Sequence, residues 1–438
     1  MDFSILPIKG CRTVVFALVC GYLITSNIYA QNNASDTIRL RMPEAEKIFI
    51  DSNLQLLASH YHVDAQKALI HQAKLWDNPV LNTDQVIAAN GKFFPYGKNP
   101  DGSYSGQYYI QVQQLITTAG KRSKLVNMAT TNAKLSELEL QEVLRNLRYQ
   151  LHIDFFTIGQ QLSNLKIYNE QEEQLELLLN GMRAQMQAGN LAQKEYLRMQ
   201  ALQYSLQQDR TELEKSIADN ETELKTLLQI KDRSFIKPVD IAAFNPENAG
   251  NLVNTELLFE TAKKNNPSYL LQETNTLFQQ QNLSYQKSLK VPDITLGPNF
   301  DRNSSFAPNY VGLGISLPLP LFNNNKGNIK SAEFSVKEQQ AMTAGAETEL
   351  RNNVNNAYQK LLLSIKQNSA AQQDFYQQYQ LMYNNILQSY RQKQISLLEF
   401  LDFFNDYTAG RQKMLQQQLN LQLAKEELNY HAGTDILK

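Results

Sequence analysis

The chain has 438 residues, and its 42 Lys and Arg residues are balanced by 43 Asp and Glu residues. This balance leaves no polybasic surface, so the composition argues against nucleic acid as a partner. The only cysteines are Cys11 and Cys20. Both precede residue 31, so the rest of the chain offers neither disulfides nor thiolate metal ligands.

Residues 1–30 have the pattern of a secretory signal peptide. Lys9 and Arg12 form a basic region, residues 14–24 form an apolar region, and Ala30 ends a short cleavage site. The apolar region is too short to cross a bilayer. We therefore expect an exported protein whose mature chain begins at Gln31.

A first structural repeat is predicted over residues 31–230. Two helices come first, and alternating polar and apolar residues then predict a β-hairpin at about 79–117. A proline-free stretch over 120–187 carries apolar residues at steps of three and four, which is typical of one buried helical stripe. At 1.5 Å per residue, that helix would be about 100 Å long. A return helix is expected over 191–229.

The second part of the chain repeats this order. A linker is predicted at 231–253, where prolines and glycine interrupt the helical pattern, and a second repeat is predicted over 254–438. It begins with helices and continues with a β-hairpin at about 292–320. A long helix over 327–392 and a return helix over 396–432 complete it.

Fixed offsets between matching residues indicate an internal duplication. Asn53 and Asn266 are 213 residues apart, and so are Pro79 and Pro292. Glu195-Tyr196-Leu197 matches Glu399-Phe400-Leu401 at an offset of 204 residues. In each repeat the two shorter helices together match the long helix in length. We therefore expect a wall of helices with both β-hairpins at one end and the helix tips at the other.

One predicted strand has the pattern of a membrane β-barrel. Its apolar residues share one face, small or polar residues share the other, and only a closed barrel satisfies the strand backbone in lipid. Four strands cannot close a barrel, so this interpretation requires oligomerisation. The alternative is a β-hairpin cap on a soluble coiled-coil protein. The residues predicted to face lipid are Val311, Leu313, Ile315, Leu317 and Leu319.

Over nearly all of its mature length the chain resembles the TolC-like outer-membrane efflux family. The resemblance rests on the duplicated plan, on the prolines before the hairpins, on Asn266-Pro267, and on residues 390–402, which are similar to the family's periplasmic tip. Gly120-Lys121-Arg122 at the start of the first long helix resembles the branch that serves heavy-metal cation efflux.

This resemblance implies a mainly α protein with a membrane β-barrel portion. Three copies would form a twelve-stranded barrel in the outer membrane of a Gram-negative bacterium, continued by a coiled-coil α-helical barrel in the periplasm. The homotrimer would be an exit duct and not an enzyme, supplied by an inner-membrane pump, of the RND type, through a periplasmic adaptor (membrane fusion protein). Drugs or secreted proteins are alternative cargoes, and an exported structural coiled-coil protein without a pore is the alternative function.

The resemblance also implies roles for the helical tips. Glu399 and Asp402 match acidic residues that ring the closed aperture, where they would favour cations. The alternative is that two acids stabilise a helix N-terminus. Adaptor contact is expected at both tips, where the alternative is helix capping, and Lys393 stands where the family commonly has glycine. The residues concerned are Ala188, Gly189, Leu191, Lys393, Gln394, Ile395 and Ser396.

The sequence contains no catalytic signature and predicts no cofactor. His60 and His62 are two residues apart and so do not share a helical face, whereas helical metal pairs need spacings of three or four. His71 and His152 are isolated in the sequence. No metal site is therefore predicted.

Overall fold

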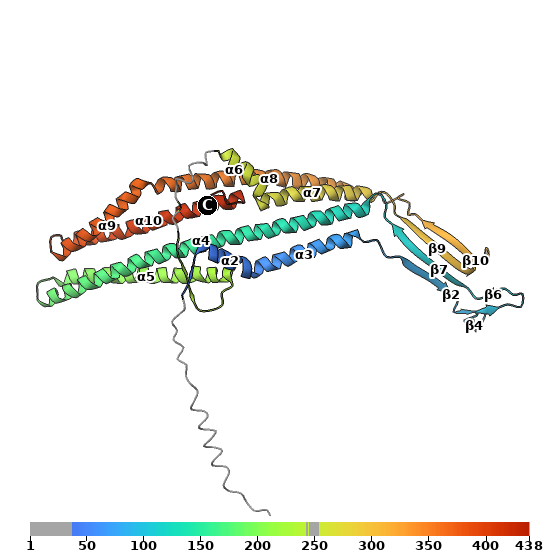
Figure 1. The fold of residues 1–438 in the computed structure, drawn as a ribbon, viewed down its shortest axis with the longest axis horizontal. Coiled ribbons are helices and arrows are strands. Elements are labelled where there is room, and N and C mark those ends of the chain that lie inside the picture. The colour runs from blue at the N-terminus through green and yellow to red at the C-terminus, as the bar shows by residue number, and fades with distance from the viewer. Residues whose placement is uncertain (1–36, 242–243, 245–253, 438) are drawn as a thin grey trace, which may run out of the picture.

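The computed structural model describes residues 37–241, 244 and 254–437, which form a long helical body with a β-sheet at one end (Figure 1). The predicted signal peptide and part of the predicted linker lie outside the described residues. The helices are α2 (Met42–Ser52), α3 (Leu54–Lys74), α4 (Lys121–Gln187), α5 (Gln193–Leu228), α6 (Thr255–Asn265), α7 (Pro267–Ser288), α8 (Lys326–Gln367), α9 (Ala370–Arg391) and α10 (Leu397–Ala432).

The main helix of the body, α4, has 67 residues and contains no proline. It packs against α3, α5, α7 and α10, so it contacts both halves of the chain. Its buried stripe includes Leu151, Phe155 and Ile158, which are spaced by three and four residues as the sequence pattern predicts. Across the residues that the structure describes, no helix is both long and apolar enough to cross a membrane.

The structure divides the long helix predicted over 327–392 into α8 and α9. At the break, Asn368 leaves the helical region, with φ of −114° and ψ of 32°. Its side-chain amide donates to the backbone carbonyls of Ser364 (2.8 Å) and Gln417 (3.1 Å). Ser369 is extended and begins the next helix. No proline or glycine marks the break, so the sequence carries no strong helix-stop signal there.

Two asparagines join the helices of the body in the same way. The side chain of Asn53 caps α3 and donates to the carbonyl of Leu227 at the end of α5 (3.0 Å). The side chain of Asn266 caps α7 and donates to the carbonyl of His431 at the end of α10 (2.9 Å). The start of each short helix therefore meets the end of a return helix, as the matching lengths predict.

The main sheet has four antiparallel strands in the order β10-β9-β7-β2. Two small hairpins extend the first β-hairpin beyond it (Figure 1). Two strands from each half of the chain therefore form one sheet. The strands are β2 (Val80–Gln85), β7 (Tyr108–Ile116), β9 (Ile294–Asn303) and β10 (Pro308–Ser316), and the small hairpins pair β3 (Ala88–Ala89) with β4 (Lys92–Phe93) and β5 (Gly97–Lys98) with β6 (Tyr104–Ser105).

The last strand ends earlier than the sequence pattern predicts. Its pairing with β9 stops at Ser316, so Leu317 and Leu319 follow the strand and are not part of it. Pro318 and Pro320 alternate with these leucines. Because proline has no backbone N–H, it cannot continue the hydrogen bonds of the sheet.

The predicted linker contains a strand that the sequence analysis did not predict. β8 (Phe235–Pro238) pairs in parallel with β1 (Thr37–Leu40), which precedes the first helix. Ile236 in β8 is fully buried, and its backbone N–H donates to the carboxylate of Glu221 (3.0 Å). This small sheet attaches the segment after α5 to the middle of the body.

Candidate functional site

The tip between α4 and α5 is closed by a glycine in the left-handed conformation. Gly189 has φ of 75°, and its N–H donates to the carbonyl of Met186 (3.0 Å). The next residue, Asn190, donates to the carbonyl of Gln185 (2.9 Å). This pair of bonds is the Schellman motif, which satisfies carbonyls at a helix C-terminus and favours glycine.

The tip between α9 and α10 has the same bonds but a different residue at the left-handed position. Lys393 has φ of 58°, and its N–H donates to Tyr390 (3.0 Å), while Gln394 donates to Ser389 (2.8 Å). A residue with a Cβ is strained in this conformation, by roughly 1–2 kcal/mol. Lys393 therefore occupies a position that glycine suits better, as its counterpart Gly189 shows.

Glu399 takes part in a capping box at the start of α10. Its backbone N–H donates to Ser396 Oγ (3.3 Å), and the backbone N–H of Ser396 donates to Glu399 Oε2 (2.8 Å). The backbone hydrogen bond from Ser396 lowers the pKa of Glu399, and the Ser396 hydroxyl adds to the effect. Within one chain, Glu399 therefore caps the start of α10, which is the alternative to a role in the gate. At the first tip, Ala192 stands at the N-cap of α5 and has no side chain that could cap it.

Two further acids share a helical face with Glu399. Asp402 and Asp406 follow it at steps of three and four residues, and all three are exposed. Asp406 was not predicted, although its spacing could have indicated it. The position in α5 that matches Asp402 at the 204-residue offset holds Arg198. The acidic stripe is therefore present at the second tip and not repeated at the first.

The residues predicted to contact an adaptor differ in how far they are exposed. Leu191 and Ile395 are partly buried against the hydrophobic cluster inside the tip, so they anchor the two turns. The other predicted contact residues are exposed and offer mainly backbone and polar groups. These residues are Ala188, Gly189, Lys393, Gln394 and Ser396.

Stacked aromatic rings fill the interior of the tip. Tyr383 of α9 stacks on Tyr407 of α10 with ring centroids 4.0 Å apart, and Tyr390 stacks on Phe400 at 4.7 Å. Arg391 at the end of α9 donates to the side chain of Gln174 in α4 (2.8 Å). The two helical hairpins therefore share one packed core near the tips.

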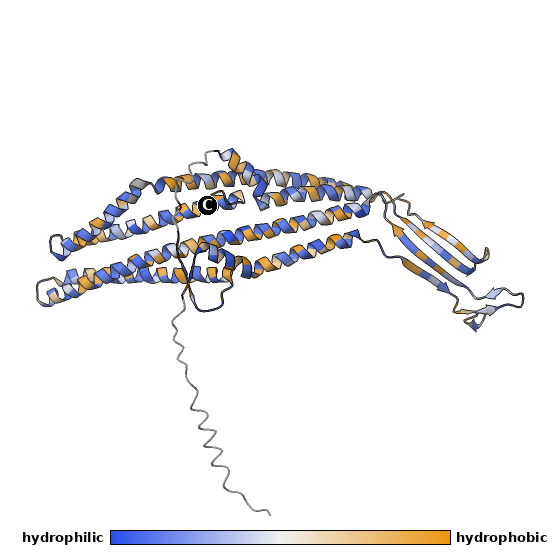
Figure 2. Cartoon of the chain, in the orientation of Figure 1, coloured by the Kyte–Doolittle hydropathy of each residue, from blue (hydrophilic) through white to orange (hydrophobic). Residues whose placement is uncertain are grey.

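The sheet at the opposite end exposes an apolar face. Val311, Leu313 and Ile315 of β10 have exposed fractions of 75, 63 and 68%, and Figure 2 shows hydrophobic and hydrophilic residues alternating along the strands. The register places them beside Phe300, Pro298 and Leu296 of β9. On the other face of β10 lie Gly312, Gly314 and Ser316.

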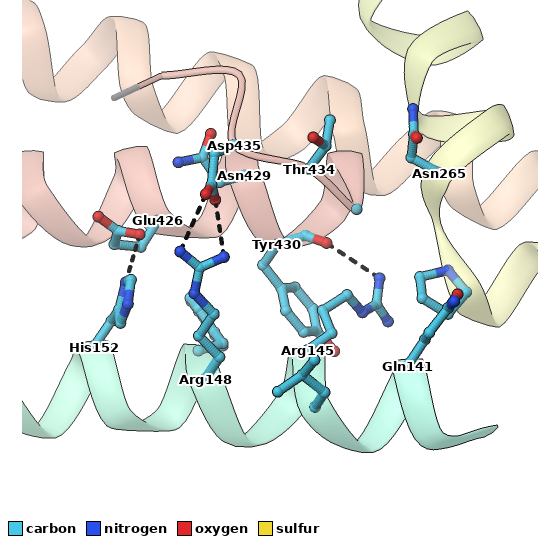
Figure 3. A pocket seen from close by; sticks show the side chains of 14 residues that line it. Gln141, Arg145, Arg148, His152, Asn265, Glu426, Asn429, Tyr430, Thr434 and Asp435 are labelled. Carbon is cyan, nitrogen blue, oxygen red and sulfur yellow. Dashed lines mark hydrogen bonds and ion pairs between the residues drawn. The ribbon is translucent and has the colours of Figure 1, made fainter. Parts of the chain in front are cut away.

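A charged cluster near the middle of the body surrounds His152, which is not isolated in the fold (Figure 3). Its Nδ1 lies 2.8 Å from Glu426 Oε2, and its Nε2 lies 2.7 Å from Glu46 Oε1. Arg148 donates both to Glu46 (2.7 Å) and to Asp435 (3.1 and 3.3 Å). These contacts join α4 to α2, to α10 and to the segment after α10.

The charges of this cluster set the pKa of its members. Burial alone would lower the pKa of His152, but hydrogen bonds to Glu426 and Glu46 outweigh it and raise the pKa to about 9. The hydrogen bond from His152 lowers the pKa of Glu46 to about 2. Both ring nitrogens face carboxylates, so the cluster is an ion-pair network. Within the described residues, no group of three or more His, Cys, Asp or Glu side chains is arranged to hold a metal ion.

Comparisons with known proteins relate this geometry to a family. The family model described as "Outer membrane efflux protein" matches residues 48–228 and 258–434. A curated relative, "Cobalt-zinc-cadmium resistance protein CzcC" of Cupriavidus metallidurans, is 21% identical over 294 residues. That alignment covers 67% of this chain and 66% of CzcC, slightly less than two thirds of the relative.

Solved structures share the fold at low sequence identity. The structure of CusC has a TM-score of 0.72 at 15% identity, and the similarity covers 90% of this chain and 92% of CusC. The Campylobacter jejuni CmeC outer membrane channel has a TM-score of 0.69 at 13% identity, covering 91% of this chain and 87% of that one. The resemblance to TolC-like channels is confirmed, and because the family matches cover most of the sequence, the chain belongs to the outer membrane efflux protein family.

Proposed function

We propose that this chain forms the outer-membrane exit duct of a tripartite efflux system, through which substrate from an inner-membrane pump passes without energy input from the duct. Family membership gives the class of protein. The observation that supports a duct is a sheet with an exposed apolar face, joined directly to a helix of 67 residues. At 1.5 Å per residue this helix is about 100 Å long, which suits a passage across the periplasm.

The sheet supports closure of a barrel by three copies. Among the residues that the structure describes, its outer strands, β2 and β10, each have one unpaired edge, and an exposed apolar edge strand tends to pair with another chain. Three sheets of four strands would pair edge to edge as a twelve-stranded barrel. The apolar residues Val311, Leu313 and Ile315 would then face lipid, and the polar face would line the lumen.

The two halves of each chain would supply equivalent parts of the wall. We assign one repeat to residues 31–230 and the other to 254–438, with 231–253 between them. The matching contacts of Asn53 and Asn266 with the ends of α5 and α10 support this duplication.

The tips would contact a periplasmic adaptor, and through it an inner-membrane pump of the RND type. The exposed residues of the two turns, centred on Gly189 and Lys393, lie at the end of the body opposite the sheet (Figure 1). With the sheet in the outer membrane of a Gram-negative bacterium, this end would point into the periplasm. The proposal assigns no enzymatic step, cofactor or nucleic acid to the chain.

Heavy-metal cations are the proposed cargo. The name of CzcC refers to cobalt, zinc and cadmium resistance, and the acidic stripe at the second tip would favour cations. Deleting the gene should raise the sensitivity of the host to divalent metal ions, and supplying the intact chain should reverse the effect. Sensitivity to drugs, with metal tolerance unchanged, would contradict the cargo but leave the duct in place.

The acidic stripe offers a direct test of a cation-selective gate formed by Glu399 and Asp402. Glu399→Gln removes the charge but retains the capping box, because glutamine also serves at this position. Combined with Asp402→Asn, it should reduce cation preference in single-channel recordings of the purified protein in a planar bilayer. Glu195→Gln at the first tip is the matched control. Equal ion selectivity in the natural protein, the Glu399→Gln/Asp402→Asn variant and the Glu195→Gln control would contradict the gate.

A further inference from the structure

A recess lies where the helical body meets the sheet. Its volume is about 430 Å³, and it is formed between the end of α3, the end of β7 and the first two turns of α4. None of the tip residues or the charged cluster around His152 contributes to it. Its lining residues are Lys74, Trp76, Thr117, Gly120, Arg122, Ser123 and Val126.

Arg122 has an unused donor in this recess. Its guanidinium lies over the ring of Trp76, with 3.9 Å between Cζ and the ring centroid. Its Nη1 is inaccessible to solvent and has no hydrogen-bond partner among the described residues. Buried polar groups normally have a partner, so the described residues leave this guanidinium with an unfilled donor.

The start of α4, which borders the recess, is positively charged. From its start to Ser136, α4 carries Lys121, Arg122, Lys124 and Lys134 and no acidic residue. Lys121 is neutralised by Asp293 (2.8 Å) on the other side of the junction. Within the described part of the chain, Lys74 and Arg122 have no ion pair, so an anion in the recess would face two uncompensated positive charges.

We infer that the recess binds the phosphate group of an anionic phospholipid. The inference rests on the proposed function, because placing the sheet in the outer membrane brings this junction to the headgroups of the periplasmic leaflet. There Arg122 and Lys74 contact the phosphate, Ser123 offers a hydroxyl, and Trp76 lies at the depth where tryptophan is enriched in membrane proteins. The phosphate pairs with the positive charges of Arg122 and Lys74 and fixes the depth of the barrel in the membrane.

The test is a titration of the delipidated, detergent-purified full chain with phosphatidylglycerol, read by native mass spectrometry. Loss of one basic residue near an anionic lipid surface corresponds to about a five-fold weaker affinity. Arg122→Gln should show this loss, and Arg122→Lys should recover most of it. Lys166→Gln removes an exposed lysine of α4 outside the recess and should bind like the natural protein. Equal binding by Arg122→Gln and Lys166→Gln overturns the inference.

Two controls separate the possible sources of failure. If inorganic phosphate displaces phosphatidylglycerol at equal concentration, the recess is a site for free phosphate and the lipid assignment is wrong. If Arg122→Gln does not fold, Lys74→Gln in the last turn of α3 takes its place. Bilayer conductance is recorded from the same preparation: a conducting protein with no preference for phosphatidylglycerol over phosphatidylcholine refutes the headgroup site alone, whereas a protein that does not insert refutes the proposed function.

Discussion

Replacing His152 by leucine would remove the central cation of the charged cluster in the middle of the body. The imidazole lies between Glu426 and Glu46 at 2.8 and 2.7 Å, and its side chain is only 10% exposed. After the substitution, Glu46 would keep Arg148, and the nearly buried Glu426 would keep Lys425 (3.3 Å). The substitution therefore leaves a buried carboxylate with a weaker partner, which is the costly way to break a buried ion pair.

The pKa of His152 gives the magnitude and the pH dependence. A value of about 9 in the folded chain, against 6.5 for the free side chain, corresponds to about 3 kcal/mol. Because the folded pKa is the higher one, this stabilisation is fully present below pH 6.5 and is lost as the pH rises through about 9. At the acid end, the contribution of Glu46 is lost as the pH falls from 4.5 towards about 2.

The assay is urea unfolding of the detergent-purified protein, followed by far-ultraviolet circular dichroism at a fixed protein concentration. At about pH 6 the His152→Leu variant should lose about 3 kcal/mol relative to the natural protein, and at about pH 9.5 most of that difference should disappear. Adding Glu426→Leu should restore part of the stability, since a buried pair is often replaced by apolar residues at little cost. The exposed His71→Leu is the control. A loss no larger than that of the control, or equal at both pH values, would refute the reasoning.

Three further predictions test the tip, the sheet and the helix break. Lys393→Gly should raise the unfolding free energy by about 1 kcal/mol by relieving the left-handed conformation, whereas Gly189→Lys should lower it. Both are measured by urea unfolding. A change of the same sign in both variants would contradict the assignment of matching Schellman motifs at the two tips. Ile315→Arg should impair membrane assembly at a cost of roughly 2–4 kcal/mol, scored as heat-resistant oligomer in membrane fractions, and Ser316→Arg on the opposite face should assemble; normal assembly of both would argue against the lipid-facing strand. Asn368→Ala removes hydrogen bonds to two backbone carbonyls and should lower the unfolding free energy by about 1–2 kcal/mol. An unchanged unfolding free energy would show that these hydrogen bonds do not stabilise the break between α8 and α9.

Local patterns in the sequence predicted most of the elements. The stripe spaced by three and four residues predicted α4 because one face of that helix is buried along its length. Asn53 and Asn266, which the repeat matches at an offset of 213 residues, both lie at helix starts, where their side chains accept hydrogen bonds from free backbone N–H groups. Alternation along β10 predicted its exposed apolar face, since successive side chains point to opposite sides of a strand.

The features that the sequence did not reveal depend on contacts between distant residues. Asn368 ends α8 through a carbonyl of α10, and β8 forms because β1 lies beside it. The same holds for the recess of Arg122, where Trp76 comes from the segment after α3.

The sequence by itself therefore determined the order, type and approximate length of most of the helices and strands, because these follow from periodicity and from the spacing of repeated motifs. The family followed from the resemblance of those motifs to TolC-like channels. Only the tertiary structure decided where a helix breaks, which charges pair and which donors are left without an acceptor. His152 is the clearest case: it has no acidic neighbour at helical spacing on its own face that would explain its charge, yet Glu426 and Glu46 reach it from 274 and 106 residues away. Pairings across such distances exist only once the helices have packed.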